Sequence, residues 1–408
     1  MTEFDVFVGI DWGDQSHQIC ILNSNGDVLD ELAARHTGES IASAFDRITE
    51  LAGGDCARIA VGIETPRGPL VASALERAMS VFAINPKQLD RLRDRTTVAG
   101  AKDDRRDALV LASSLRSDLA LFRRVKLGSE TLVAIGELVR MHEEVVQQRV
   151  VVGHRLRDQL QRYFPQVLAL GRIHEERWLW ELLQRAPTPR LAKSLSLKKI
   201  DSILTRHRIR RLTANEVKAT LLEKPLSVAP GVTQACEMHV KLLLEQIQLL
   251  EEQRRSSSKS MKALLDELGS SDEERREHRD AQVLRSLPGV GTIVSATMLA
   301  EAWEPLERRD YRTLRTYAGV APVTKQSGKS HRVCLRRACN KRVARAVVHW
   351  ATVAIQQDPR ARALYDRLRA QGKTYGRAIR GVADRLLAML VAMLKRGELY
   401  DPNRRALA

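Results

Sequence analysis

Cysteine is scarce in this chain of 408 residues, and the few cysteines are scattered. They form no CxxC pair, which a zinc site usually needs, and their odd number does not suit a disulfide framework. We therefore expect neither kind of site and interpret the cysteines as ordinary reduced thiols. The five are Cys20, Cys56, Cys236, Cys334 and Cys339.

The sequence also lacks a long apolar run. No stretch approaches the roughly 20 apolar residues that cross a bilayer as a helix. The N-terminus has no basic start followed by a long apolar core and a cleavage site, which a signal peptide would have. We therefore expect a cytoplasmic protein without a membrane partner.

What the chain has in excess is positive charge. Lys and Arg number 67 against 50 Asp and Glu, so the formal net charge is +17. The chain is 44% hydrophobic and 29% charged, which predicts a largely globular protein of two or three domains. The excess favours a polyanionic partner, above all nucleic acid, although a solvated basic surface has the same composition. Binding to nucleic acid should depend strongly on salt.

Residues 1–125 alternate strand and helix signals, and Asn25-Gly26 supplies a hairpin turn. The order predicts an α/β domain of the RuvC-like (ribonuclease-H-like) type with a mixed sheet. A meander should come first, followed by strands joined through crossover helices. The predicted strands are 6–11, 18–23, 28–32, 58–64 and 81–85, and the predicted helices are 40–52, 69–78 and 86–93.

Residues 126–280 predict an all-α connector. Two long helical patterns, 131–162 and 232–268, place apolar residues among many charges, which is typical of a coiled coil or helical hairpin. Between them, residues 165–230 are less regular, and we expect Trp178 and Trp180 to pack there.

Residues 281–408 predict a third, mainly α unit. LPGVG at 287–291 sits between two helical patterns, as in a helix-hairpin-helix that contacts a phosphate backbone, although a plain αα-turn has the same pattern. Gly328 marks a loop, and a helix with an apolar core-facing stripe spans 375–395. Six basic residues cluster near His331 without an intervening acid and form a candidate nucleic-acid surface: Arg332, Arg336, Arg337, Lys341, Arg342 and Arg345.

Four acids carry the chemical signal. Asp11 and Glu64 follow apolar runs, so both stand at the C-terminal ends of predicted strands. Asp104 and Asp107 are three residues apart on a predicted helix and share a face, but Asp103 and Asp107 share one too. Each acid alone suits a turn or a helix cap. Together they predict a divalent-metal site for phosphodiester chemistry.

Ser327 is a candidate nucleophile. It lies in the glycine-flanked segment KQSGKSH beside the basic cluster, and attack on phosphorus would link it covalently to DNA. A Ser-Gly pair is more often an ordinary loop, and Ser330 is a nearby rival. The sequence does not identify the group that takes the serine's proton.

An ordered set of motifs gives the chain a family resemblance. The motifs are GID at 9–11, IET at 63–65, KDDRRDA at 102–108, LPGVG at 287–291, YAGVAP at 317–322 and SG at 327–328. With these the chain resembles a DEDD transposase of the bridge-RNA-guided insertion-sequence family, the IS one-ten and IS eleven-eleven type.

The resemblance implies a RuvC-like domain, a coiled-coil connector and a C-terminal transposase domain. The middle region is long for the family, and we expect an insertion near 165–230. The resemblance also implies that the acidic quartet binds Mg²⁺ (or Mn²⁺) and that Ser327 forms a serine–DNA intermediate. An RNA encoded by the element would pair with both target and donor DNA. Dimers would assemble into tetramers, with domains of different subunits at one composite site, and a DNA recombinase would be nucleoid-associated.

Two positions depart from the family pattern. Asp103 replaces the usual Thr or Asn, which leaves three neighbouring acids, and Cys339 replaces the usual Gly before Asn340. Two other classes of function remain. A RuvC-like nuclease or junction resolvase would use the same acids with a water nucleophile. In a non-catalytic nucleic-acid-binding protein the acids would be structural.

Overall fold

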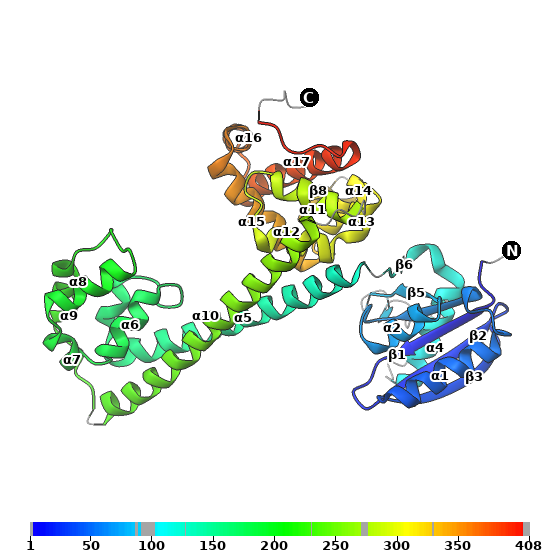
Figure 1. Cartoon of the computed structure of the whole chain (residues 1–408), viewed down its shortest axis with the longest axis horizontal. Helices are drawn as coiled ribbons and strands as arrows, with labels where there is room; N and C mark the ends of the chain where they lie inside the picture. The colour runs from blue at the N-terminus through cyan, green and yellow to red at the C-terminus, as the bar shows by residue number, and fades with distance from the viewer. Residues whose placement is uncertain are drawn as a thin grey trace. The chain divides into compact units, whose positions relative to one another are not determined.

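The computed structural model describes residues 3–85, 89–90, 103–126, 128–229, 231–270, 276–328 and 330–402. The chain divides into two compact units, Met1–Leu127 and Gly128–Ala408, and each is described by itself (Figure 1). Unit 1 is a mixed α/β domain and unit 2 is mainly helical. The three-part division at 125 and 280 stays a prediction.

A six-stranded mixed sheet with the order β3-β2-β1-β4-β5-β6 forms the centre of unit 1. The first three strands make an antiparallel meander, β4 and β5 run parallel to β1, and β6 is antiparallel to β5. The strands are β1 Val6–Asp11, β2 Ser16–Asn23, β3 Val28–Arg35, β4 Ile59–Ile63, β5 Ser80–Ala83 and β6 Arg123–Arg124.

This topology confirms the predicted mixed sheet with a meander followed by crossovers. β1 has its predicted bounds, and the other four predicted strands differ at their ends. β6 was missed because two exposed arginines carry no strand pattern. The predicted helices at 40–52 and 69–78 correspond to α1 Gly38–Leu51 and α2 Pro69–Glu76. The one predicted at 86–93 lies largely outside the described residues.

Helices cover both faces of the sheet. On one face, α1 and α2 pack in a core that contains Ile10, Phe45 and Leu70. On the other, α4 Asp104–Asp118 packs in a separate core with Phe7 and Ala60. Both faces are therefore apolar, which explains why β1 and β4 read as continuous apolar runs instead of alternating patterns.

Two long helices organise unit 2. α5 Glu130–Tyr163 and α10 Val232–Ser270 pack against each other and match the two predicted long patterns to within two residues (Figure 1). A small helical subdomain lies between them in the chain. It comprises η3 Pro165–Leu170, α6 Arg177–Arg185, α7 Pro189–Ser194, α8 Leu197–Arg206 and α9 Ala214–Leu222. Trp178 and Trp180 are buried in its core, as predicted.

The remaining helices of unit 2 build a further core around Trp350 of α15 and the apolar stripe of α17, and the two remaining strands contribute no buried residue to it. That stripe confirms the predicted core-facing helix. The elements are α11 Arg276–Ser286, α12 Thr292–Glu301, α13 Trp303–Glu307, α14 Tyr311–Tyr317, β7 Val323–Ser327, β8 Ser330–Cys334, α15 Lys341–Gln357, α16 Pro359–Ala370 and α17 Tyr375–Arg396.

Gly328 lies in a turn, as expected, but the segments on either side of it form the β7–β8 hairpin, which was not predicted. Most of its side chains are polar and exposed, so the sequence has no apolar alternation to reveal a strand. All five cysteines are free thiols. Among the described residues, no helix is long and apolar enough to cross a membrane.

Glu251 ties the two long helices together through charge. Its carboxylate, only 4% exposed, pairs with Arg149 of α5 at 2.9 Å and with Arg254 and Arg255 of α10 at 2.8 and 3.0 Å. Burial alone would raise the pKa of Glu251, but the hydrogen bonds and charges of the arginines outweigh it and lower the pKa to about 2. The ionised carboxylate therefore stabilises the folded helix pair.

We expect Glu251→Gln to lower the free energy of unfolding by about 1.5–3 kcal/mol at pH 7, since hydrogen bonds to a charged group are lost. A carboxyl pKa lowered on folding contributes stability above its ordinary value of 4.5, and that contribution is lost as the pH falls towards 2. The stability difference between wild type and variant should therefore shrink over this range in urea-unfolding curves. Glu252→Gln, at the exposed neighbouring position, is the control and should leave stability unchanged. A difference that stays constant with pH would contradict this role.

Candidate active site

Two of the predicted acids stand at neighbouring strand ends. β1 and β4 are parallel neighbours, and their register pairs Ile10 with Ile63. Asp11 is the last residue of β1, and Glu64 directly follows β4. Because adjacent strands lie about 4.8 Å apart, this register brings both acids to one edge of the sheet. Both are partly exposed there.

The glycine two positions before each acid shows which face of the sheet is involved. A Cβ on Gly9 would lie 2.0 Å from the Ala108 carbonyl oxygen, and a Cβ on Gly62 would lie 3.4 Å from that of Leu111. Both glycines therefore face α4. Since residues i and i+2 of a strand share a face, Asp11 faces α4 as well. The same alternation, continued one residue past β4, puts Glu64 on that face.

The direction of α4 decides which of its ends meets these acids. Near its C-terminal end, Arg116 donates a hydrogen bond to the Ser24 carbonyl oxygen at 3.4 Å, in the turn between β2 and β3. That turn lies beside the start of β1. α4 therefore runs back along β1, and its first turn, with Asp104 and Asp107, lies at the end of the sheet that carries Asp11.

The three neighbouring acids of α4 differ in their surroundings. Asp103 is the N-cap, and its carboxylate accepts a hydrogen bond from the Arg105 backbone N–H at 3.2 Å. Asp104 is exposed and stands four residues before the buried Ala108, so it begins the row of side chains that faces the sheet. Asp107 is 2% exposed. Asp103 thus has a structural task of its own.

The residue types at this end of unit 1 fit a divalent cation, because hard cations take carboxylate oxygens. As the side chains are placed, no three His, Cys, Asp or Glu residues within the described ranges are grouped closely enough to hold a metal ion. The acids share one end of the domain without forming a closed ligand set. Residues 91–102, which lead into Asp103, lie outside the described part of the chain.

A buried histidine, His17, supports the loop after Asp11 and was not predicted from the sequence. The Gly13 backbone N–H donates to His17 Nδ1 at 3.4 Å, and His17 Nε2 lies 3.0 Å from His36 Nδ1. Burial, and then the charge of His36, lower the pKa of His17. The neutral His17 thus anchors the chain just beyond the acid, with its ring 4.9 Å from that of Trp12. Its neighbours Ser16 and Gln18 are polar, so the sequence gives no sign that His17 is buried.

The two candidate serines face each other in unit 2. Ser327 ends β7, Ser330 begins β8, and the hairpin register pairs them. Gly328 between them has φ +53°, a left-handed conformation that favours glycine. Both serines are exposed. Within the described residues, no hydrogen bond involves either hydroxyl.

The six basic residues predicted as one surface fall into different environments. Arg342 pairs with Glu143 of α5 at 2.5 Å, and Arg345 pairs with the same carboxylate. Arg336 donates to the Ala321 carbonyl oxygen at 3.1 Å. These three have contacts within the protein, whereas Arg332, Arg337 and Lys341 are exposed. Lys341 also donates to the Arg337 carbonyl oxygen.

Comparison with known proteins bears on both units. A family model described as a DEDD-type transposase matches residues 8–165, and a second, described as the transposase IS116/IS110/IS902 family, matches residues 281–366. The mini-circle putative transposase for IS117 of Streptomyces coelicolor is 32% identical over 410 residues, 98% of this chain and 96% of the relative. The chain belongs to the IS110 family of DEDD transposases.

Other relatives agree with this assignment. The transposase is 40% identical over 211 residues to the putative transposase y4uE of Sinorhizobium fredii, which covers 51% of this chain and 58% of that relative. It is 27% identical over 403 residues to the insertion element IS110 uncharacterized 43.6 kDa protein of Streptomyces coelicolor, 97% of this chain and 95% of that protein. The chain is therefore a DNA transposase, an enzyme of insertion-sequence recombination.

The LPGVG turn of the transposase is docked onto α15. Gly289 has φ +79°, and a Cβ there would lie 2.7 Å from the Ala354 backbone nitrogen. Its N–H donates to Gln357 Oε1 at 2.9 Å, and the Trp350 indole donates to the Pro288 carbonyl oxygen at 2.9 Å. Packing within the fold thus explains this glycine without a nucleic-acid contact.

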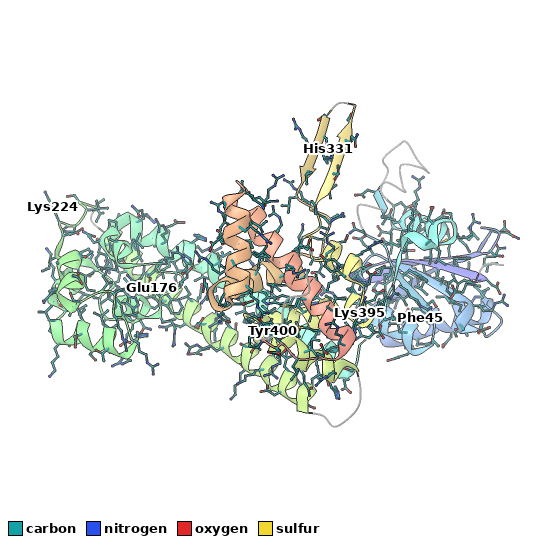
Figure 2. The ribbon with its side chains drawn as sticks, turned by 90° about the horizontal axis from the view of Figure 1, so that it is seen from above. Phe45, Glu176, Lys224, His331, Lys395 and Tyr400 are labelled. Carbon is teal, nitrogen blue, oxygen red and sulfur yellow. The ribbon has the colours of Figure 1, made fainter. Side chains whose placement is uncertain are left out.

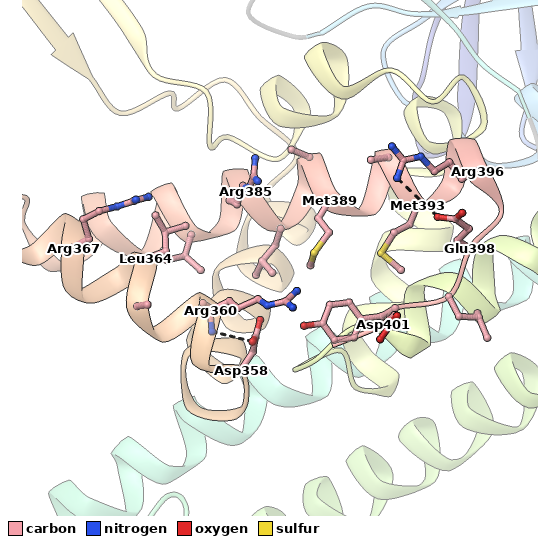
Figure 3. Close-up of a pocket in the computed structure, with 18 residues that line it drawn as sticks. Asp358, Arg360, Leu364, Arg367, Arg385, Met389, Met393, Arg396, Glu398 and Asp401 are labelled. Carbon is pink, nitrogen blue, oxygen red and sulfur yellow. Dashed lines mark hydrogen bonds and ion pairs between the residues drawn. The ribbon is translucent and has the colours of Figure 1, made fainter. Parts of the chain in front are cut away.

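A pocket of about 1060 Å³ lies elsewhere in unit 2, between α16, α17 and residues 398–401 (Figure 3). Leu364, Met389 and Met393 line it, and charged residues ring it. None of the acidic quartet or the two serines lines this pocket, and Arg396 there pairs with Glu398 at 3.9 Å. We therefore assign it no part in the reaction.

Gly9→Ala should separate α4 from β1. The new methyl would meet the Ala108 carbonyl oxygen at 2.0 Å and the Ala112 backbone nitrogen at 2.5 Å, and neither can move without the helix. We expect the free energy of unfolding to fall by about 1–3 kcal/mol, as for other overpacked cores, and transposition to be lost. Gly38→Ala, where the Cβ meets nothing within 4 Å, is the control. If Gly9→Ala had the same free energy of unfolding as the wild type, the close approach of α4 to Gly9 would be contradicted.

Proposed function

We propose that this transposase cleaves and rejoins DNA at the ends of its element and at the target, with a metal-binding acidic quartet and a serine nucleophile. The observation that supports it most is the arrangement of unit 1. The parallel register of β1 and β4 and the direction of α4 bring Asp11, Glu64, Asp104 and Asp107 to one end of the domain.

The proposed ligands are these four carboxylates, and the ion is Mg²⁺ or Mn²⁺. We favour Asp104 over Asp103 because Asp103 caps α4, whereas Asp104 begins the row that faces the sheet. Bound divalent cations would neutralise charge on the phosphoryl group and on the leaving oxygen. The rigid sheet edge and the first turn of α4 would hold the ligands in position. We propose accordingly that unit 1 is a domain of the RuvC-like type.

Ser327 is the proposed nucleophile. Its Oγ would form a bond to phosphorus while the bond from phosphorus to one DNA oxygen breaks. The serine loses its proton and the leaving DNA oxygen gains one, so the phosphodiester is conserved in a serine–DNA link. Attack by another DNA hydroxyl on that link would rejoin the strand and restore the serine. We favour Ser327 over Ser330 because the family's SG motif matches Ser327–Gly328.

The partners follow from the family resemblance. We propose that the acids of one subunit and the serine of another form a composite site in dimers that assemble into tetramers, with α5 and α10 as a coiled-coil element. We also propose that an element-encoded RNA pairs with target and donor DNA. We propose that the LPGVG turn and its two flanking helices have the geometry of a helix-hairpin-helix. The Gly289 amide already donates to Gln357 of α15, so we do not propose that this amide binds a phosphate. An enzyme acting on chromosomal DNA would be found at the nucleoid.

The test is a search for a denaturant-stable protein–DNA adduct after the transposase meets element-end DNA, guide RNA and Mg²⁺. We expect an adduct with wild type and with Ser330→Ala, none with Ser327→Ala, and a strongly reduced yield with Asp11→Ala.

Each contrary outcome has a distinct meaning. An adduct from Ser327→Ala would refute the nucleophile. Metal-dependent cleavage without any adduct would identify a RuvC-like nuclease or junction resolvase with a water nucleophile. Full strand exchange by Asp11→Ala would refute the metal site.

A further inference from the structure

The β7–β8 hairpin stands apart from the cores of unit 2. Side chains 324–327 and 330–333 are exposed, and the hairpin around His331 projects from the helices of its own unit (Figure 2). Near its base, the Arg377 guanidinium donates a hydrogen bond to the Val333 carbonyl oxygen at 3.2 Å. A lone two-stranded hairpin is only marginally stable in water. An exposed ribbon of this kind has both faces available to a ligand.

The register gives the two faces different chemistry. Lys325 pairs with Arg332, and Ser327 pairs with Ser330. Because strand residues i and i+2 share a face, these two pairs lie on the same side of the ribbon. The opposite side carries two pairs without Lys or Arg, Thr324 with Val333 and Gln326 with His331.

The cationic pair is unfavourable in the free protein. Like charges directly opposite on a sheet destabilise it by about 0.2–1 kcal/mol. Within the described residues, neither Lys325 nor Arg332 forms an ion pair with a carboxylate, although unit 2 pairs many of its other arginines. An anion bound between the two side chains would remove this repulsion.

We propose that Lys325 and Arg332 bind the phosphodiester that Ser327 attacks and hold it over the serine hydroxyl. Two residues along a strand span about 6.8 Å, so the long basic side chains reach the space above Ser327. The Arg332 guanidinium offers paired N–H donors to two phosphate oxygens, and Lys325 adds a point charge. The partner is thus a nucleic-acid phosphate next to the hairpin tip. This assignment rests on the proposed role of Ser327.

The deciding experiment measures single-turnover adduct formation on element-end DNA with guide RNA and Mg²⁺, together with the Kd for the same DNA. We expect Lys325→Gln and Arg332→Gln each to slow adduct formation about 10- to 100-fold, since a charge-assisted hydrogen bond is lost. The Kd should change less than the rate, because many other phosphates are still contacted. Arg332→Lys should recover part of the rate.

Two matched variants on the opposite face serve as controls. Gln326→Ala and His331→Gln change the same strands one residue away and should keep the wild-type rate. Thermal unfolding should be unchanged in all of these variants, because the hairpin lies outside the cores.

The outcomes separate this inference from the proposed function. If Ser327→Ala abolishes the adduct but Lys325→Gln and Arg332→Gln react at the wild-type rate, the phosphate-binding pair is refuted and the nucleophile stands. Equal losses for the control variants, or losses confined to the Kd, would also refute it. An adduct that persists in Ser327→Ala would refute the nucleophile itself.

Discussion

The acidic end of unit 1 depends on one close approach, that of helix α4 to strand β1 at Gly9. Only a residue without a Cβ leaves room for the backbone of Ala108 and Ala112 at this distance. The contact sets how deep α4 lies on the sheet, and the hydrogen bond from Arg116 to Ser24 shows the direction in which the helix runs. Together they bring the first turn of the helix to the strand end where Asp11 stands. A helix held farther away would leave Asp104 and Asp107 remote from that strand.

Carboxylates gathered in this way repel one another unless a cation or donor groups compensate. Their charge contrasts with that of the whole chain, which carries a net +17 and can hold the nucleic-acid backbone elsewhere. Ser327, our proposed nucleophile, belongs to the other unit, on a hairpin that its own cores do not bury. The rigid acidic edge thus belongs to unit 1 and the exposed basic ribbon to unit 2, and we propose that the edge of one subunit and the ribbon of another act on one phosphodiester.

Much of this organisation could be predicted from sequence, and the failures have physical causes. The apolar runs ending at Asp11 and Glu64 located both strands, and the long charged amphipathic patterns located α5 and α10 to within two residues. The face and depth of α4 could not be predicted, because they depend on contacts between residues about a hundred positions apart.

The predicted basic surface shows the same limit of prediction from sequence. Arg342 and Arg345 are indistinguishable in sequence from Arg332, yet both pair with Glu143, some two hundred residues earlier in the chain. The β7–β8 hairpin escaped prediction because neither of its faces is apolar. The contact between the buried His17 and the exposed His36 was not predicted because a polar pair nineteen residues apart has no periodic signature.

The most direct test of the acidic site is Mn²⁺ binding, followed by electron paramagnetic resonance, in the DNA-bound transposase. We expect Asp104→Asn and Asp107→Asn to lose tightly bound Mn²⁺. Asp103→Asn should retain it, because asparagine caps a helix as well as aspartate does. Loss of Mn²⁺ from Asp103→Asn with retention in Asp104→Asn would contradict the assignment of the third acid. Wild-type binding by all three variants would contradict the metal site at the first turn of α4.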